Sequence, residues 1–348
     1  MYINSSRFLE SASAESAAGQ LLILGFDGTA YTPAIGALFK KFRPGGVILF
    51  SRNMESPDQI KTLVSDMVKL SEDVTGLTPF VCVDQEGGRV SRLPQKFYPK
   101  FPTAKLLAAD GSEELVYNTY NEMGVILRGL GFNVDFAPVA DLDTNPVNPI
   151  IGDRSFGADP EKTAKLCVAA INGLRGAGIL SCSKHFPGHG DTSLDSHLDL
   201  PVDPRPAKRF FEAELYPFEK TIEAGVDFIM TAHVVYTALD AELPATLSEK
   251  IVTGILRDKM GYKGIIAGDD MDMKAIADRW GDAEAARLAL KAGVDVLLVC
   301  HESPRRQTVY DAVLREVADG ELDDAGIKSR IERILAAKSK IAVVRGDG

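Results

Sequence analysis

The chain has 348 residues, of which 45% are hydrophobic, and its formal net charge is −10. This length suits one α/β barrel with its loops, and the apolar share is enough for a large core. The acidic surplus argues against nucleic-acid partners, because no excess of basic residues is present to neutralise phosphates. There is no run of about 18 apolar residues, so we expect no membrane span and no membrane partner.

Residues 1 to about 16 read as an N-terminal arm, and this stretch lacks the apolar core of a secretory signal. The cysteines also lack the CxxC spacing of zinc sites and redox motifs; they are Cys82, Cys167, Cys182 and Cys300. We therefore expect reduced core cysteines and a cytoplasmic location. The oligomeric state does not follow from the sequence.

Eight short apolar runs recur along the chain, separated by longer amphipathic stretches. The runs are rich in β-branched residues and apolar on both faces, which is typical of parallel strands covered by helices. They are LLILGF from Leu21, GGVILF from Gly45, PFVCVD from Pro79, VDFAPVAD from Val134, ILSCSKHF from Ile179, VDFIMTAHV from Val226, GIIAGDD from Gly264 and VDVLLVC from Val294. Eight strand–helix units predict a (β/α)8 TIM-type barrel. A doubly wound sheet is the alternative, but no G-x-G-x-x-G follows the first run.

The amphipathic stretches carry helix signals. Ser56 and Pro57 predict the start of one helix, and Gly293 predicts the end of another. Apolar residues in the segment from 324 to 341 recur on one helical face. About 48 residues follow the last run, which leaves room for one helix and a tail from about 340 to 348. We therefore predict a single catalytic domain over residues 1–348.

Polar residues close several of the apolar runs: Asp84 the third, Asp141 the fourth, Lys184 and His185 the fifth, His233 the sixth, and Asp269 and Asp270 the seventh. Barrel enzymes build their active sites at these strand ends, so the set predicts one polar pocket. Each residue also has a structural interpretation. Asp84 could cap a turn, Arg154 could pair with Asp153 or Asp141, and Lys184 could hold a carboxylate.

The segment KHFPGHGDTSLDSHLDLP, from Lys184 to Pro201, holds three of the five histidines of the chain. A metal site is one interpretation, but Pro187 and the two glycines of the segment preclude the helix that an H-E-x-x-H site needs. A serine nucleophile is another, but no G-x-S-x-G motif is present. We predict no metal and no cofactor.

Six sequence blocks together resemble glycoside hydrolase family 3, in particular its single-domain bacterial β-N-acetylglucosaminidases. They are DQEGGRVSR (84–92), DFAPVADLDTNP (135–146), IIGDRSFGADP (150–160), KHFPGHGDTSLDSHLDLP (184–201), MTAHVVY (230–236) and GIIAGDDMDM (264–273). The blocks span nearly the whole predicted barrel. The long histidine-containing block is specific to this branch of the family.

The resemblance implies a role for each matching residue. Asp269 is implied as the nucleophile, and Asp195 with His197 as the acid/base dyad. The residues implied to bind the terminal N-acetylglucosamine are Asp84, Arg92, Arg154, Lys184 and His185. Gly268 is a small departure, because the family usually has Ser or Thr before the nucleophile; the glycine removes no functional group.

These residue types suit a retaining glycosidase, which needs an attacking carboxylate and a proton donor for the leaving oxygen. The spacing of Asp195 and His197 lets the carboxylate reach one imidazole nitrogen, which fixes the ring and favours its charged form. Strand alternation would turn Asp270 to the opposite face, so we interpret it as structural. We expect His189 to shape the loop. If His197 is not the donor, Glu86 is the next residue to consider.

The predicted activity is removal of non-reducing terminal N-acetylglucosamine by an exo-hydrolase. The resemblance implies peptidoglycan-derived muropeptides as substrates. Three alternatives stay open: β-glucosidase or β-xylosidase specificity, phosphorolysis instead of hydrolysis, and a sugar-binding barrel without turnover.

Overall fold

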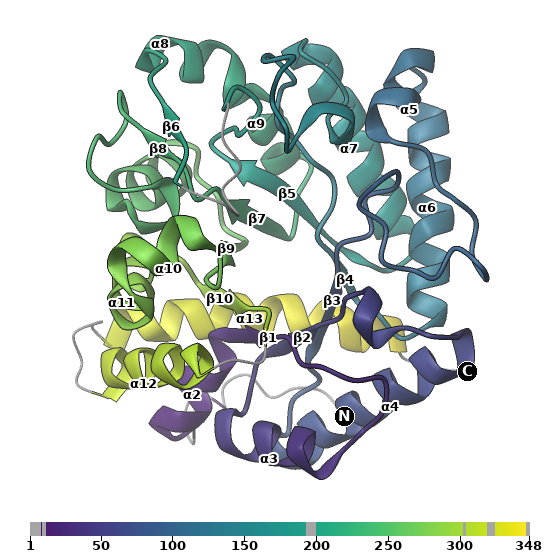
Figure 1. Ribbon diagram of the computed structural model, residues 1–348, viewed down its shortest axis with the longest axis vertical. Coiled ribbons are helices and arrows are strands. Elements are labelled where there is room, and N and C mark those ends of the chain that lie inside the picture. Colours follow the sequence, from purple (N-terminus) through teal and green to yellow (C-terminus); the bar gives the residue numbers. More distant parts are fainter. Residues whose placement is uncertain (1–7, 9–11, 193–199, 302–303, 319–323, 346–348) are drawn as a thin grey trace.

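The computed structural model describes residues 8, 12–192, 200–301, 304–318 and 324–345. Eight parallel strands close into a barrel in chain order, and the last strand pairs with the first (Figure 1). The strands are β1 (Leu22–Leu24), β2 (Gly46–Ile48), β3 (Phe80–Val83), β4 (Val134–Asp135), β5 (Leu180–Phe186), β7 (Phe228–Thr231), β9 (Ile265–Asp270) and β10 (Val296–Val299). Each lies within one of the eight apolar runs, so the predicted barrel is confirmed.

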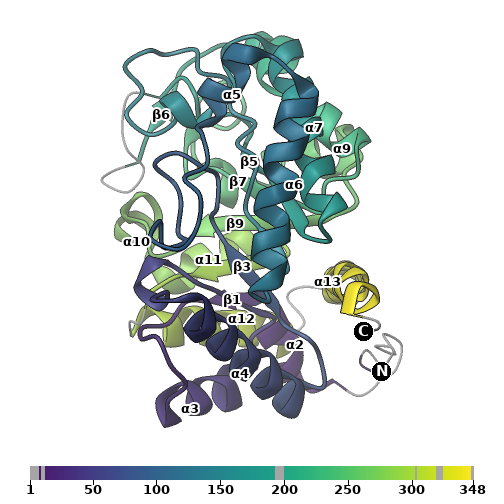
Figure 2. The same ribbon diagram turned by 90° about the vertical axis from the view of Figure 1, so that its right-hand side faces the viewer.

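Helices surround the strands, and Figure 2 shows α6 and α7 side by side on the outside of the barrel. The α-helices are α2 (Ala14–Gln20), α3 (Pro33–Phe42), α4 (Pro57–Thr75), α5 (Ala104–Asp110), α6 (Glu113–Gly129), α7 (Pro160–Gly176), α8 (Ala207–Arg209), α9 (Tyr216–Glu223), α10 (Lys274–Trp280), α11 (Asp282–Ala292), α12 (Arg305–Ala318) and α13 (Asp324–Arg345). Shorter or wider helical turns are η1 (Ser51–Asn53), η2 (Gly152–Arg154), η3 (Phe210–Glu214), η4 (Ala245–Leu247) and η5 (Lys250–Lys259).

Both predicted helix boundaries are confirmed. The Ser56 side chain accepts a hydrogen bond from the Gln59 amide at the start of α4, with Pro57 in the first turn. Gly293 ends α11 with φ at 110°, a left-handed conformation that side chains other than glycine rarely adopt. These local signals explain why the sequence predicts the two helices so closely.

The chain ends differ from the prediction. Two helices, α12 and α13, follow the last strand instead of one, because Val309 and Val313 give the first of them an apolar stripe that packs on the core. Helix α13 continues to Arg345, so the predicted tail from about 340 is helical over most of its length. At the other end, α2 begins at Ala14, inside the predicted arm.

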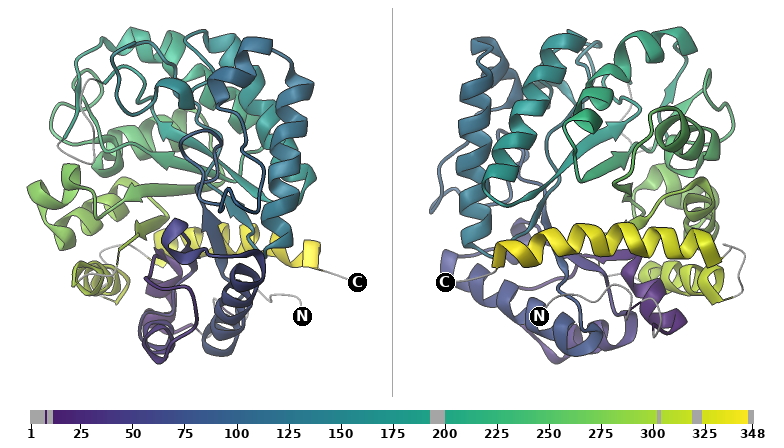
Figure 3. Two further views of the ribbon diagram at one scale, coloured as in Figure 1. Left: turned by 45° about the vertical axis from the view of Figure 1, so that its right-hand side comes forward. Right: turned by 180° about the vertical axis from the view of Figure 1, so that it is seen from behind.

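Helix α13 crosses the N-terminal end of the barrel as one long helix (Figure 3). Its Lys338 is fully buried there. The Lys338 ammonium donates to Gln20 Oε1 at 2.7 Å and lies 5.2 Å from the centre of the Phe80 ring. This end of the barrel is therefore closed by a side chain from the last helix.

A second, two-stranded parallel sheet lies outside the barrel and was not predicted. It pairs β6 (Val202–Asp203) with β8 (Val235–Tyr236). All four cysteines are buried and free, as expected for core residues. In the part of the chain that the structure describes, no helix has the length and apolar character needed to cross a membrane.

Candidate active site

A cavity of about 350 Å³ opens at the C-terminal ends of the barrel strands. Six predicted site residues line it: Asp84, Arg92, Arg154, Lys184, His185 and Asp269. They come from four different strand ends and their loops, so the barrel brings together residues that are far apart in sequence. The two residues of the predicted dyad, Asp195 and His197, lie outside the described residues.

Lys184 is the central cation of this cavity. Its side chain is 3% exposed, and its Nζ lies 2.8 Å from Asp84 Oδ1 and 2.7 Å from Glu86 Oε1. Burial alone would lower the pKa of Lys184, but the two carboxylates outweigh burial and raise it. The lysine therefore stays charged and holds both acids, as its structural interpretation predicted.

Arg154 completes this network. Its Nε and Nη2 each donate to one oxygen of Glu86 at 2.8 Å, a two-pronged geometry that fixes both groups. The structural alternative for Arg154, an ion pair with Asp153 or Asp141, is not what the structure shows, because Asp153 pairs with Arg89 at 2.9 Å and Asp141 with His185. Glu86 follows Asp84 by two residues, so the same loop supplies a second acid, and this acid binds the Arg154 guanidinium.

Glu86 is thus an anchor, which the sequence interpretation missed. Burial would raise its pKa, but Arg154 and Lys184 hold the pKa of Glu86 well below its ordinary value. A carboxyl group that stays ionised has no proton to give, so Glu86 is a poor substitute for His197 as a general acid. The sequence signal for the anchoring role of Glu86 is its position in DQEGGR, two residues after Asp84.

Asp141 is the second buried anchor. Its Oδ2 lies 2.7 Å from His185 Nδ1, and its Oδ1 accepts the backbone amides of His185 and His189. Burial would raise the pKa of Asp141, but His185 and these hydrogen bonds lower it. Since Nδ1 faces Asp141, the Nε2 side of the His185 ring is presented toward Arg154, 3.5 Å away.

His189 shapes the loop after β5. Its Nδ1 lies 2.8 Å from the Thr192 hydroxyl, and it is 2% exposed. Burial, assisted by the neighbouring His185, lowers the pKa of His189 to about 4. A neutral, buried ring agrees with the predicted structural role.

Arg92 approaches the cavity from the loop after β3. One of its Nη atoms lies 3.9 Å from Asp84 Oδ2, and its guanidinium lies 5.5 Å from the centre of the Phe50 ring. Among the described residues, its buried Nε–H has no hydrogen-bond acceptor.

Asp269 and Asp270 end β9, and both line the cavity. The expectation that Asp270 faces away is wrong. The pairing of β9 with β10 shifts register between Ala267–Val296 and Asp270–Leu298, and such a bulge interrupts the alternation of side chains.

The structural role of Asp270 does agree with its contacts. Its Oδ1 accepts the backbone amides of Asp272 and Cys300, each at 3.1 Å, and its carbonyl oxygen lies 3.0 Å from His233 Nε2. Burial, with the nearby Asp272 charge, raises the pKa of Asp270 to about 6. Asp269 is half-buried, and its Oδ1 accepts the Asp270 amide at 2.8 Å.

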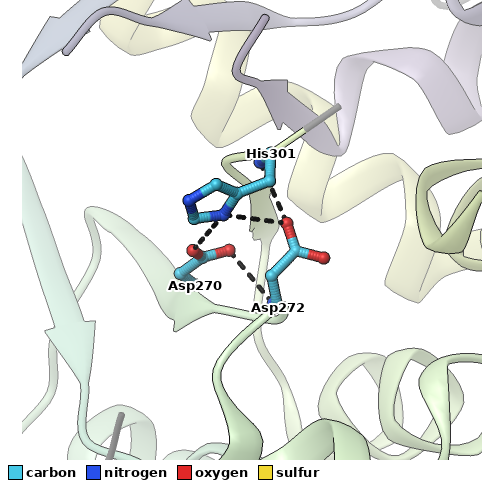
Figure 4. A group of neighbouring side chains, drawn as sticks. All are labelled: Asp270, Asp272 and His301. Carbon is cyan, nitrogen blue, oxygen red and sulfur yellow. Dashed lines mark hydrogen bonds and ion pairs between the residues drawn. The ribbon is translucent and has the colours of Figure 1, made fainter. Parts of the chain in front are cut away.

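One group in the described part of the chain could supply three ligands to a cation: Asp270, Asp272 and His301 (Figure 4). His301 Nδ1 lies 3.6 Å from Asp270 Oδ2 and 3.5 Å from Asp272 Oδ2. The His301 side chain is 62% exposed. The three residues also contact one another directly, so this arrangement does not by itself require a cation.

Comparison with known proteins identifies the family to which the chain belongs. Residues 15–337 match the glycosyl hydrolase family 3 N-terminal domain. The chain is 39% identical to a beta-hexosaminidase of Thioalkalivibrio sulfidiphilus over 91% of this chain and 89% of that protein. It is 33% identical to beta-hexosaminidase A of Pseudoalteromonas piscicida over 90% of this chain.

A solved structure of a family 3 beta-N-acetylglucosaminidase from Paenibacillus sp. FPU-7 superposes with a TM-score of 0.93 at 37% identity. The alignment covers 97% of this chain and 64% of that one, and the chain spans 56% of the Pseudoalteromonas protein. The chain therefore belongs to glycosyl hydrolase family 3.

Proposed function

We propose that the protein is an exo-acting β-N-acetylhexosaminidase that removes terminal N-acetylglucosamine. The observation that carries this proposal is the cavity at the strand ends, which Asp269 lines together with buried, charged, hydrogen-bonding side chains. Its volume of about 350 Å³ falls at the lower end of the range for small-molecule sites. The names of the relatives described above support the choice of sugar.

In this proposal Asp269 is the nucleophile. One of its carboxylate oxygens forms a bond to the anomeric carbon while the bond from that carbon to the leaving oxygen breaks. The proton for the leaving oxygen comes from His197, and Asp195 holds the imidazole. A water molecule then attacks the anomeric carbon, His197 accepts its proton, and the bond to Asp269 breaks. Two inversions retain the configuration of the sugar.

Asp269 is a better nucleophile than its neighbour for two reasons. Asp270 Oδ1 is already occupied by two backbone amides. Its pKa, raised to about 6 by burial and Asp272, also leaves part of it protonated near neutral pH. A protonated carboxyl group does not attack the anomeric carbon.

The other cavity residues bind the sugar in this proposal. Asp84 is 16% exposed and offers carboxylate edges to hydroxyl groups, while Lys184 fixes its position. The Arg92, Arg154 and His185 side chains, which line the cavity, supply donors. Because these groups are buried, a ligand that lacks the matching hydroxyl leaves them unpaired, which disfavours its binding.

Peptidoglycan-derived muropeptides are the substrate class that the sequence resemblance suggests. β-Glucosidase or β-xylosidase specificity and phosphorolysis are the competing functions. The deciding experiment measures turnover of p-nitrophenyl β-glycosides of N-acetylglucosamine, glucose and xylose, each with and without phosphate. We expect the N-acetylglucosaminide to be cleaved fastest and its rate to be independent of phosphate. A faster glucoside, or a sugar phosphate as product, would overturn the proposal.

A further inference from the structure

Arg205 is surrounded by three carboxylates that belong to different parts of the chain. Its guanidinium lies 3.2 Å from Asp191 Oδ2, 2.6 Å from Asp203 Oδ2 and 2.5 Å from Glu214 Oε1. Asp203 and Glu214 are almost completely buried, whereas Asp191 is 30% exposed. Asp191 precedes and Asp203 follows the segment 192–202, which contains the proposed dyad residues.

The chain before this segment is fixed to the neighbouring β4 loop. A Cβ atom added at Gly190 would lie 1.6 Å from the Leu142 carbonyl oxygen, so only glycine fits this close approach. The Thr144 hydroxyl donates to Asp191 Oδ1 at 3.1 Å, and the Asn145 amide donates to the Asp191 carbonyl at the same distance.

The chain after the segment is fixed to the outer sheet. Asp203 belongs to β6, which pairs with β8. The Tyr236 hydroxyl of β8 donates to the Gly188 carbonyl at 3.0 Å, so the same sheet also contacts the chain on the other side of the segment. Arg205 is therefore the side chain that bonds to both flanks directly.

The charges explain why an arginine is needed here. Burial raises the pKa of Glu214 despite its two arginine neighbours, and among the described residues its Oε2 has no hydrogen-bond partner. Without the Arg205 guanidinium, the buried carboxylates of Asp203 and Glu214 would lie close together, and among the described residues the ion pair left to them is that of Glu214 with Arg209. Two like charges in a low-dielectric site repel strongly, which would push β6 away from η3 and displace the flank that follows the segment.

We propose that Arg205 is a positioning residue for acid/base catalysis, because it joins the two ends of the segment that carries Asp195 and His197. This inference rests on the proposed function, in which that pair moves the proton. The guanidinium suits this role since its planar fork binds several carboxylate oxygens at fixed angles. Arg205 itself lines no part of the catalytic cavity.

The experiment compares Arg205→Ala with Arg209→Ala on two substrates. Arg209 is the matched control, because it contacts Glu214 at 3.2 Å and is 40% exposed, but the structure gives it no bond to Asp191 or Asp203. The substrates are N,N′-diacetylchitobiose, whose leaving oxygen needs a proton, and the 2,4-dinitrophenyl N-acetylglucosaminide, whose leaving group departs unaided.

For Arg205→Ala we expect kcat/KM on chitobiose to fall by about 10²-fold, the scale of a catalytic group misplaced by roughly 1 Å. On the dinitrophenyl substrate kcat/KM should change by less than about threefold, since that step needs no donor. Arg209→Ala should keep the wild-type ratio between the substrates. Loss of folded protein would lower both rates equally, so only a change in the ratio supports the proposal.

Three further variants make the result decisive. Asp191→Ala removes only the half-exposed partner of Arg205 and should shift the ratio in the same direction as Arg205→Ala. It therefore tests the proposal even if Arg205→Ala does not fold. Arg205→Lys should restore part of the wild-type ratio. His197→Ala separates the two hypotheses. If it leaves the ratio unchanged, the proposed dyad is wrong. If His197→Ala shifts the ratio but neither Arg205→Ala nor Asp191→Ala does, the positioning role of Arg205 is wrong.

Discussion

The two ends of the barrel both contain buried charges, but they use them differently. At the C-terminal end, Lys184 and Arg154 are 3% and 11% exposed, and they hold acids at the wall of a cavity. At the N-terminal end lies a larger cavity of about 730 Å³. There Asp295 receives both Arg257 and Arg333, and Asp227 receives Lys340.

Cavity size therefore does not identify the candidate active site, because the larger cavity lies at the opposite end of the barrel. At the N-terminal end, Arg333 and Lys340 of α13 are 24% and 58% exposed and reach in from solvent to acids near the barrel. These pairs attach α13 to the barrel. At the C-terminal end Lys184 is buried between two carboxylates at a cavity, whereas the buried Lys338 at the other end contacts the Gln20 amide. Burial of several charges together is worthwhile where a ligand uses them.

The largest expected effect is at Asp269. Replacement by alanine removes the nucleophile, so we expect kcat on the N-acetylglucosaminide to fall by about 10⁴-fold or more. Thermal unfolding should change little, since Asp269 is only half-buried. Azide should restore part of the activity and give a product of inverted configuration. A variant that retains a tenth of wild-type kcat would contradict the role of Asp269.

The comparison between the two ends predicts opposite phenotypes for two arginines. Arg154→Ala should lose roughly 2–4 kcal/mol in kcat/KM, because Glu86 and the sugar each lose a charged hydrogen bond. Arg333→Ala should leave kcat/KM unchanged and lower the free energy of unfolding by about 1 kcal/mol, since its partner Asp295 keeps Arg257. Steady-state kinetics and urea unfolding of both variants provide the check. Asp84→Ala should behave like Arg154→Ala.

At the closed end, Lys338 should make stability depend on pH. Burial lowers its pKa from an ordinary 10.5 to about 7. Between these values the unfolded chain binds more protons than the folded one, so the free energy of unfolding rises with pH. From pH 7 to 9 the gain is ~2 kcal/mol. Lys338→Met should lose this gain, whereas Lys340→Met, on the exposed side of α13, should keep it. Parallel pH profiles for wild type and Lys338→Met would refute a depressed pKa.

The smallest predicted effect is a titration next to the nucleophile. Asp272 is the second cause, after burial, of the raised pKa of Asp270. Asp272→Asn removes this like charge, so the pKa of Asp270 should move down from about 6. Carbon-13 NMR of the labelled carboxyl groups follows the titration directly. An unchanged or higher pKa would mean that Asp272 does not act through its charge.

The strands and the site differ in how much of them follows from sequence. The apolar runs predict all eight strands, and local caps such as Ser56 predict helix boundaries, because both depend on neighbouring residues. The pairing of Arg154 with Glu86 was missed because 68 residues separate them, and only barrel closure brings them together. The orientation of Asp270 was missed because a bulge between β9 and β10 is a property of two strands.

The assignment of the nucleophile is the central claim, and covalent trapping tests it most directly. A 5-fluoro N-acetylglucosaminyl fluoride slows both steps and, with its good leaving group, lets the glycosyl-enzyme accumulate. Peptide mass spectrometry of the trapped protein then locates the ester within residues 264–273, which contain three candidate aspartates. We predict that Asp269 carries the sugar. A sugar on Asp270, or active enzyme that is never labelled, would contradict the account.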